Sequence, residues 1–181
     1  MSRAAVLVEN LFSAIAYPLH VVAADEQATG HEAFRIANGR RSAFDYYESI
    51  TANAQRIIKI TCDRVRSANG CALDRGHNLG GEQVVLEASD DDFATPAQTC
   101  FDIILPTTTA PGTLDDALGV RTEEGAWLIR FPQRTALYWR LRIPAMGAGV
   151  RPKIVGAWLG NWYAFDPDFP VAADADDLIV E

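Results

Sequence analysis

Lysine is nearly absent from this sequence, and so are the motifs of several enzyme classes. Of the 16 basic residues, only Lys59 and Lys153 are lysines. There is no Gly-x-Ser-x-Gly nucleophile elbow, no Cys-x-x-Cys spacing, and no glycine-rich phosphate loop that leads from a strand into a helix. These absences argue against a serine hydrolase of the elbow type, a redox dithiol and a nucleotide-phosphate site. The sequence therefore predicts no catalytic residue, no cofactor and no metal.

Long apolar runs and paired cysteines are also missing. The early apolar run 4–8 stops at Glu9, which is short of both a signal-peptide core of about 7–15 residues and a membrane span of about 20. We therefore expect neither a secretion signal nor membrane insertion. The three cysteines, Cys62, Cys71 and Cys100, cannot all pair within one chain. Buried free thiols made in a reducing cytoplasm are the simpler interpretation, with a Cys62–Cys71 disulfide as the alternative.

Charge is unevenly placed along the 181 residues. The chain has 24 acidic and 16 basic side chains, a net charge of −8, which argues against a general nucleic-acid binder. Much of the imbalance lies in 166–181, where Pro167 and Pro170 also exclude a central strand. We expect a folded domain over 1–165 and an extended acidic C-terminal arm over 166–181. The six acids of this arm are Asp166, Asp168, Asp174, Asp176, Asp177 and Glu181.

Alternation of apolar and polar residues with a period of two dominates the rest of the chain. In 136–143, Trp139 and Leu141 would point to one side, while Tyr138, Arg140 and Arg142 would point to the other. Such alternation is typical of strands with one buried face. Turn-forming residues separate the segments, so the sequence predicts an all-β fold, an antiparallel β-sandwich. The predicted strands are 54–62, 82–89, 98–105, 126–131, 136–143 and a more central strand over 153–159; predicted turns include 68–70 and 90–92.

The densest polar cluster is Asp74, Arg75, His77 and Asn78. One interpretation makes His77 a general base oriented by Asp74, as in a small hydrolase, although no nucleophile accompanies the pair. The other interpretation makes the cluster a structural loop whose short polar side chains bond to the backbone. The second interpretation needs no missing partner, and we prefer it.

The acidic triplet Asp90, Asp91 and Asp92 has two readings. Carboxylates bind hard cations, but the spacing lacks the pattern of a calcium loop, so a solvated turn capped by Ser89 and Asp90 is preferred. These acids could also accept hydrogen bonds from a ligand.

Aromatic residues gather towards the last predicted strand. Trp127 and Trp139 lie on inward strand faces and should be core. Trp162 and Tyr163 follow Trp158; together with tyrosines 46 and 47 they could form a sugar-stacking platform or pack the barrel end and a neighbouring subunit.

Several motifs, taken in order, resemble one family. They begin with Asn10-Leu11-Phe12 and end with Trp158-Leu159-Gly160, and they cover roughly residues 9–165. This order resembles the discoidin or galactose-binding-like jelly roll (coagulation-factor type C fold), in the form that tailed bacteriophages encode among their structural genes. The intervening motifs are Tyr17-Pro18-Leu19, Asp45-Tyr46-Tyr47-Glu48-Ser49, Asp74-Arg75-Gly76-His77-Asn78-Leu79, Val84-Val85-Leu86, Tyr138-Trp139-Arg140-Leu141 and Arg151-Pro152-Lys153-Ile154-Val155-Gly156.

The resemblance implies a jelly-roll β-sandwich whose end loops bind sugars, lipids or proteins, and a place in a virion tail. The leading hypothesis is therefore a non-enzymatic structural protein of a phage or phage-like virion, made in the host cytoplasm, that contacts other tail proteins and copies of itself in a symmetric ring. Arginine enrichment is in keeping with such interfaces. The alternative is a carbohydrate-binding module for host-surface glycans that uses Trp162, Tyr163 and the acidic triplet. In the arm, the predicted anchors on a partner subunit include Phe169, Leu178 and Ile179.

Overall fold

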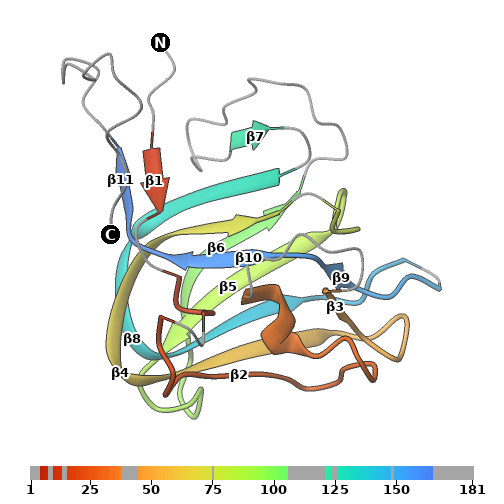
Figure 1. The fold of residues 1–181 in the computed structure, drawn as a ribbon, viewed down its shortest axis with the longest axis horizontal. Helices are drawn as coiled ribbons and strands as arrows, with labels where there is room; N and C mark the ends of the chain where they lie inside the picture. Colours follow the sequence, from red (N-terminus) through yellow and green to blue (C-terminus); the bar gives the residue numbers. More distant parts are fainter. Residues whose placement is uncertain are drawn as a thin grey trace.

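The structure is almost entirely β, as the sequence predicts. The computed structural model describes residues 5–7, 10–13, 16–37, 45–74, 76–105, 121–123, 126–147 and 149–164. The predicted arm over 166–181 lies outside these residues, and so do Arg75, Phe169, Leu178 and Ile179. Within the described ranges the elements are β1 (Ala5–Leu7), β2 (Val21–Ala24), the 3-10 helix η1 (Ala33–Ala37), β3 (Tyr47–Glu48), β4 (Arg56–Leu73), β5 (Gln83–Ser89), β6 (Gln98–Ile104), β7 (Arg121–Glu123), β8 (Ala126–Ile143), β9 (Lys153–Ile154), β10 (Ala157–Gly160) and β11 (Trp162–Ala164) (Figure 1).

Two long antiparallel strands, β4 and β8, form the spine of the fold. Each has 18 residues. Their register shifts between Thr61 and Arg66 and again between Ala68 and Gly70, and such bulges bend a strand and increase its twist. Figure 1 shows both strands curving round one side of the molecule, so that each strand runs through both layers of a sandwich.

The first layer is built on 56–61 of β4 and 136–143 of β8. In it, β2 pairs with β4, β5 pairs with β8, and β6 pairs with β5. The second layer is built on 70–73 of β4 and 126–130 of β8, with β10 beside β4 and β7 beside β8. Two short ribbons, β1 with β11 and β3 with β9, complete the described pairings, all of which are antiparallel. The predicted antiparallel β-sandwich is confirmed.

The core lies between the two layers. Trp139, from the first layer, is fully buried, and Trp127, from the second, is 2% exposed. Both tryptophans are therefore core residues, as the alternation predicts. Burial of this apolar surface is the main stabilising contribution to such a fold. Other core residues include Ile58, Ile60, Leu86 and Leu141 from the first layer and Cys71, Leu73, Ile129 and Leu159 from the second.

The predicted turn at 68–70 and the predicted division of 126–143 into two strands were wrong. The expected turn at 68–70 lies inside β4, because Ala68 and Gly70 both pair with β8, and the chain bends there without reversing. The predicted strands 126–131 and 136–143 are accordingly two halves of β8.

The third wrong prediction is the central strand over 153–159. It is divided into β9 and β10, which lie at the margins of their sheets rather than at a centre. Gly156 stands at the break, and a Cβ there would come within 3.1 Å of the Asp74 side chain. The break therefore brings the backbone close to the end of β4.

The three cysteines are free and buried, which confirms the thiol prediction and excludes the Cys62–Cys71 disulfide. Burial raises the pKa of each thiol to about 12. No helix in the described part of the chain has the length and apolar character to cross a membrane.

Candidate functional site

Four connecting segments meet at one end of the sandwich, here called the loop end: residues 25–32, 49–55, 76–82 and 149–152 (Figure 1). Backbone hydrogen bonds link them to each other or to β3 and β9. Ala28 N–H donates to Glu48 O (2.8 Å), and Ser49 N–H donates to Pro152 O (3.3 Å). Gly149 N–H donates to Asn53 Oδ1 (3.0 Å). The loop end is thus a connected surface and not a set of independent loops.

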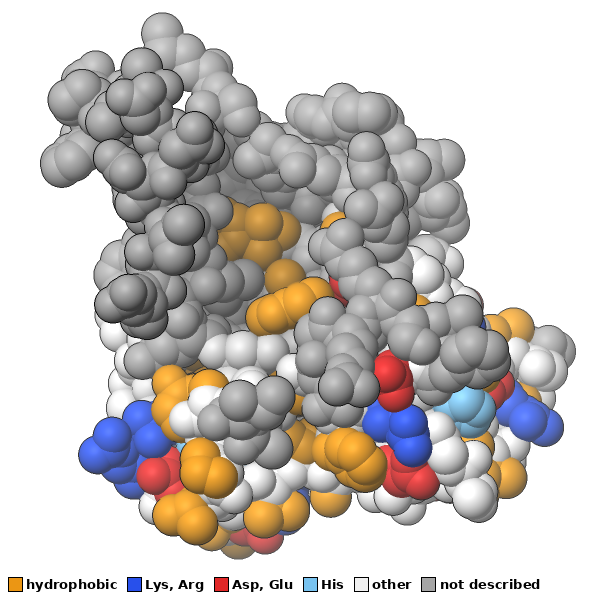
Figure 2. All heavy atoms as spheres, in the orientation of Figure 1, with side chains coloured by type: hydrophobic (Ala, Val, Ile, Leu, Met, Phe, Trp, Pro, Cys, Tyr) orange, Lys and Arg blue, Asp and Glu red, His pale blue; other side chains and the backbone are white. Residues whose placement is uncertain are grey.

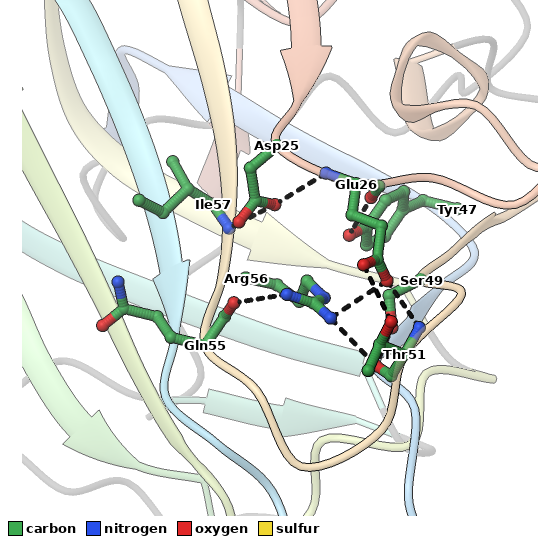
Figure 3. Close-up of polar contacts among 8 residues, drawn as sticks. All are labelled: Asp25, Glu26, Tyr47, Ser49, Thr51, Gln55, Arg56 and Ile57. Carbon is green, nitrogen blue, oxygen red and sulfur yellow. Dashed lines mark hydrogen bonds and ion pairs between the residues drawn. The ribbon is translucent and has the colours of Figure 1, made fainter.

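A buried arginine fastens two of these segments (Figure 3). The guanidinium of Arg56 donates to Gln55 O (2.8 Å) and Thr51 O (3.1 Å), and its Nη2 lies 2.9 Å from Glu26 Oε1. The Glu26 carboxylate also accepts from the backbone N–H and the hydroxyl of Thr51, and these bonds are the main reason that its pKa is lowered. The side chain of Arg56 is only 7% exposed. This cluster of Glu26, Thr51 and Arg56, here called the clamp, holds segment 49–55 against segment 25–32.

Two further residues, Tyr47 and Asp25, bond to the backbone around the clamp (Figure 3). Tyr47 is fully buried and donates its hydroxyl to Glu26 O (2.9 Å); burial raises its pKa. Asp25 Oδ1 accepts from Ile57 N–H (3.1 Å) and Glu26 N–H (2.9 Å). Tyr47 is therefore structural and unavailable for the sugar stacking that the sequence suggested for it.

A stack of rings lies beside the clamp. The imidazole of His31 stacks on the ring of Tyr46, with centroids 3.9 Å apart and planes 16° from parallel. Lys153 Nζ lies 4.1 Å from the centroid of the same Tyr46 ring, within the range of a cation–π contact. All three side chains are half-buried. They come from three separate segments, so the stack locks β3 and β9 to the loop that contains His31.

An ion-pair chain continues from the stack along η1, which directly follows segment 25–32; η1 and Asp45 are counted with the loop end from here on. Arg35 Nε donates to Glu32 Oε2 (2.7 Å), and its Nη1 donates to Asp45 Oδ1 (2.9 Å). The Arg35 hydrogen bond is the largest cause that lowers the pKa of Glu32 to about 2, and the same bond raises the pKa of Arg35. The three side chains remain 20–29% exposed, and the neighbouring Phe34 is 49% exposed. Fixed donors and acceptors beside an open apolar ring are groups that orient a small polar ligand.

The predicted loop cluster also reaches the loop end, in its structural role. Asn78 donates to Arg151 O (2.7 Å) and accepts from Lys153 N–H (2.8 Å). His77 Nδ1 accepts from Leu79 N–H (3.1 Å), and its Nε2 is buried without a hydrogen-bond partner. Desolvation lowers the pKa of His77.

The catalytic alternative does not fit this arrangement. Because Nδ1 of His77 accepts a backbone hydrogen bond, it carries no proton to donate to an orienting carboxylate. Asp74 is 4% exposed, and its backbone N–H donates to Gly156 O (2.8 Å). The structure therefore does not assemble the base and orienter that the hydrolase interpretation requires.

The acidic triplet lies away from the loop end, in the turn between β5 and β6. Asp90 Oδ1 accepts from Leu137 N–H (3.2 Å), and Asp91 Oδ2 accepts from the backbone and hydroxyl of Thr95. Asp92 bonds Lys59 Nζ through both oxygens (2.8 and 3.0 Å). The carboxylates serve the turn and one lysine, as the solvated-turn interpretation proposed. Among the described residues, no three His, Cys, Asp or Glu side chains converge on a metal position.

Trp158 and Trp162 lie on a different surface, the outer face of the second layer. Trp162 is 9% exposed and packs over Gly70, where a Cβ would meet Trp162 Cβ at 3.2 Å. Trp158 is half-buried in a row with Ala72 and Leu128, and Figure 2 shows hydrophobic side chains in this part of the molecule. The backbone of Tyr163 belongs to β11. The structure thus separates Trp158 and Trp162 from Tyr46 and Tyr47, which lie at the loop end, so the five aromatic residues do not form one platform.

Sequence reasoning missed most of the loop-end residues. His31, Glu32 and Arg35 were not singled out, and Asp45 entered only as the first residue of the motif Asp45-Tyr46-Tyr47-Glu48-Ser49. The spacing of Glu32 and Arg35 by three residues is the one local signal of the ion-pair chain. His20 was not singled out either; its ring nitrogens bond Leu11 O (3.0 Å) and Asp63 Oδ1 (2.9 Å).

Comparisons with known proteins bear on the fold. No family model matches the chain, and no curated protein matches it. Solved structures do match. Chitosan-binding module 1 of a chitosanase/glucanase from Paenibacillus sp. IK-5 superimposes with a TM-score of 0.59 at 18% identity, over 83% of this chain and 98% of that chain.

Two modules from Clostridium perfringens match to a similar extent. The family 32 carbohydrate-binding module of NanJ, solved with galactose, gives a TM-score of 0.58 at 9% identity, over 80% of this chain and 93% of that chain. CpGH89CBM32-5, solved with GalNAc-β-1,3-galactose, gives 0.56 at 9% identity, over 78% and 94%. At such identities the likeness concerns the fold alone. The fold of this chain is a galactose-binding-like antiparallel β-sandwich, as the resemblance of its motifs implied.

Proposed function

We propose that this chain is a non-catalytic glycan-binding module that binds saccharides at the loop end. The observation that carries the proposal is the ion-pair chain Glu32–Arg35–Asp45 beside the exposed ring of Phe34. Support from outside the chain comes from the three modules above, which match over nearly their whole length. This ranks the carbohydrate-binding alternative above the tail-subunit hypothesis.

The chemistry of the loop end suits a sugar that is held through its hydroxyl groups and one apolar face. A carboxylate accepts hydroxyl protons and a guanidinium donates to hydroxyl oxygens, so Asp45 and Arg35 together would hold two adjacent hydroxyl groups. The ring of Phe34 offers a flat apolar surface to the C–H face of a pyranose. The clamp keeps the neighbouring loops in place, so little ordering is needed when a sugar binds.

Calorimetric titration with galactose, GalNAc-β-1,3-galactose and chitosan oligosaccharides tests the proposal. We expect measurable binding of at least one of them, and a loss of about tenfold in affinity for Arg35→Ala and for Phe34→Ala, since each removes contacts worth about 1.4 kcal/mol. Arg64→Ala, which removes an exposed arginine of β4, is the matched control and should bind like the parent. No binding of any of the three ligands, or equal affinities in all variants at unchanged Tm, would contradict the proposal.

The virion role remains a prediction from the sequence. No comparison supports a tail location, a ring of subunits or contact with other virion proteins. Host-surface glycan binding is compatible both with a free-standing module and with a virion component. Sedimentation of the purified chain would test self-assembly, and a monomer at all concentrations would weigh against the ring.

A further inference from the structure

A second polar surface lies on the outer face of the first layer, away from the loop end. Lys59 of β4 pairs in register with Arg140 of β8, and Arg142 follows two residues later on the same face. Arg140 in turn faces Glu87 of β5. This set of Lys59, Glu87, Arg140 and Arg142 is here called the arginine face.

One carboxylate serves both arginines. Arg140 Nε donates to Glu87 Oε2 (2.6 Å), and Arg142 Nε approaches the same oxygen at 3.5 Å. Each guanidinium has five N–H donors, and no described residue bonds their terminal amino groups. The side chains of Arg140 and Arg142 are 25% and 26% exposed, against 11% for Glu87. Two cations that share one anion leave an excess of positive charge with donors open to solvent.

The neighbouring charges do not cancel this excess. Lys59 is neutralised by Asp92, whose two oxygens both bond Nζ. Asp25 and Asp102 flank Arg142 in its row, each separated from it by one residue, Ile57 and Val85 respectively. Asp25 accepts from the backbone N–H groups of Ile57 and Glu26, and Asp102 accepts from Gln83. Arg140 and Arg142 therefore have one ion-pair partner between them, the Glu87 carboxylate.

An unusual turn places an aromatic ring on this surface. Phe93 has φ +65° and Asp92 has φ +56°, a left-handed conformation that is rare for a bulky side chain. Ser89 Oγ accepts Phe93 N–H (2.9 Å) and holds the turn. The result is that the ring of Phe93 lies 4.0 Å from the Arg140 guanidinium carbon. Strained residues of this kind concentrate at binding sites.

A second ring borders the same face. Lys59 Nζ lies 5.8 Å from the centroid of Tyr138, and both Tyr138 and Phe93 are half-buried. The arginine face therefore combines fixed, incompletely used guanidinium groups with two partly open rings. Guanidinium groups bind carboxylate and sulfate through paired N–H bonds, and the rings can contact the C–H groups of a sugar.

We propose that the arginine face binds an acidic saccharide through its oxyanion, either the carboxylate of a uronic acid or a sulfate ester. Arg142 and Arg140 donate to the oxyanion, and Phe93 keeps Arg140 in position. This site is distinct from the loop end and does not depend on the function proposed there.

Titration with sodium glucuronate, a sulfated disaccharide, sodium sulfate and galactose tests the proposal, because the arms separate the two oxyanions from each other, from the free ion and from a neutral sugar. We expect glucuronate or the sulfated disaccharide to bind more tightly than sodium sulfate. Arg142→Gln should weaken that binding by about tenfold, while Arg35→Ala at the loop end leaves it unchanged. Arg64→Gln controls for net charge.

Three outcomes would overturn the proposal. They are the absence of binding by both acidic saccharides, equal binding of free sulfate, and an equal loss in Arg142→Gln and Arg64→Gln. Phe93→Gly gives a check that survives any folding defect of the arginine variants, because glycine accepts a positive φ without strain. It should weaken acidic-saccharide binding at least fivefold with Tm unchanged or raised; unchanged binding would likewise reject the site.

Discussion

Replacement of Arg56 by methionine should destabilise the protein substantially. Arg56→Met keeps an unbranched apolar stem and removes the two hydrogen bonds to Gln55 O and Thr51 O. Hydrogen bonds from a charged group contribute about 1.5–3 kcal/mol each, and the relief of the buried Arg56 Nε, which has no partner, returns about 1–2 kcal/mol. The net loss is then about 3 kcal/mol. The contact with Glu26 adds little to this loss, because that carboxylate is accessible to solvent.

Thermal unfolding followed by circular dichroism measures the effect. For a domain of this size, about 3 kcal/mol corresponds to a decrease in Tm of about 6–12 °C. Arg56→Lys should lie between parent and methionine, because one ammonium group cannot reproduce the forked contacts of a guanidinium.

The matched control is Arg64→Met, which makes the same chemical change at an exposed position of β4. It should alter the free energy of unfolding by no more than about 0.5 kcal/mol. If Arg56→Met shifts Tm by less than about 2 °C, or by as much as Arg64→Met does, then the clamp does not stabilise the loop end in the way described.

Three further predictions concern packing, pH and thiol chemistry. Gly70→Ala would push a Cβ to 3.2 Å from Trp162 Cβ and should cost about 1–3 kcal/mol in urea unfolding; Gly147→Ala, where no atom lies within 4 Å, should be nearly neutral, and equal effects would refute the packing argument. Burial lowers the pKa of His77 from 6.5, so below pH 6.5 the unfolded chain binds a proton at this residue more readily than the folded chain does. The contribution of neutral His77 to the free energy of unfolding should therefore be complete above pH 6.5 and should decline as the pH falls from 6.5 to the lowered value. The urea midpoint of His77→Gln should accordingly change less than that of the parent between pH 7.5 and 5.5, and parallel pH profiles would exclude this role. The folded protein should react with Ellman's reagent at pH 8 only after unfolding, because the thiolate is the reactive form and each thiol is buried with a pKa of about 12; rapid reaction of the native protein would contradict the assigned burial of Cys62, Cys71 and Cys100.

The sheet architecture was predictable because its signal is local. Alternation with a period of two marks which side chains of a strand face the core, and Trp127 and Trp139 lie where that pattern places them. The turn predicted at 68–70 failed for an equally physical reason. An Asn-Gly pair favours a reversal, but here Asn69 bonds the backbone of Trp162 and the chain continues through the bend as a strand.

The loop end was predictable only in part, because its contacts join residues that are remote in sequence. The single feature recovered was the backbone-bonding role of His77 and Asn78, which short-range loop chemistry suggests. The stack of His31 on Tyr46 beside Lys153 requires knowledge of which strands pair, and no spacing rule supplies it. Trp162 shows a related limit, since its place near a strand end left stacking and packing both open, and only the glycine that lies under it in the structure explains its burial.

The shared strands of the two layers also bear on how the chain is made. On the order of 50 residues separate the end of β4 from the start of β8, so at a synthesis rate of about 5–20 residues per second β4 leaves the ribosome roughly 3–10 s before its main partner. During that interval β2 is the neighbour already available to it. Neither layer can be completed until β8 emerges, and the sandwich should therefore form in one late cooperative step rather than one sheet at a time.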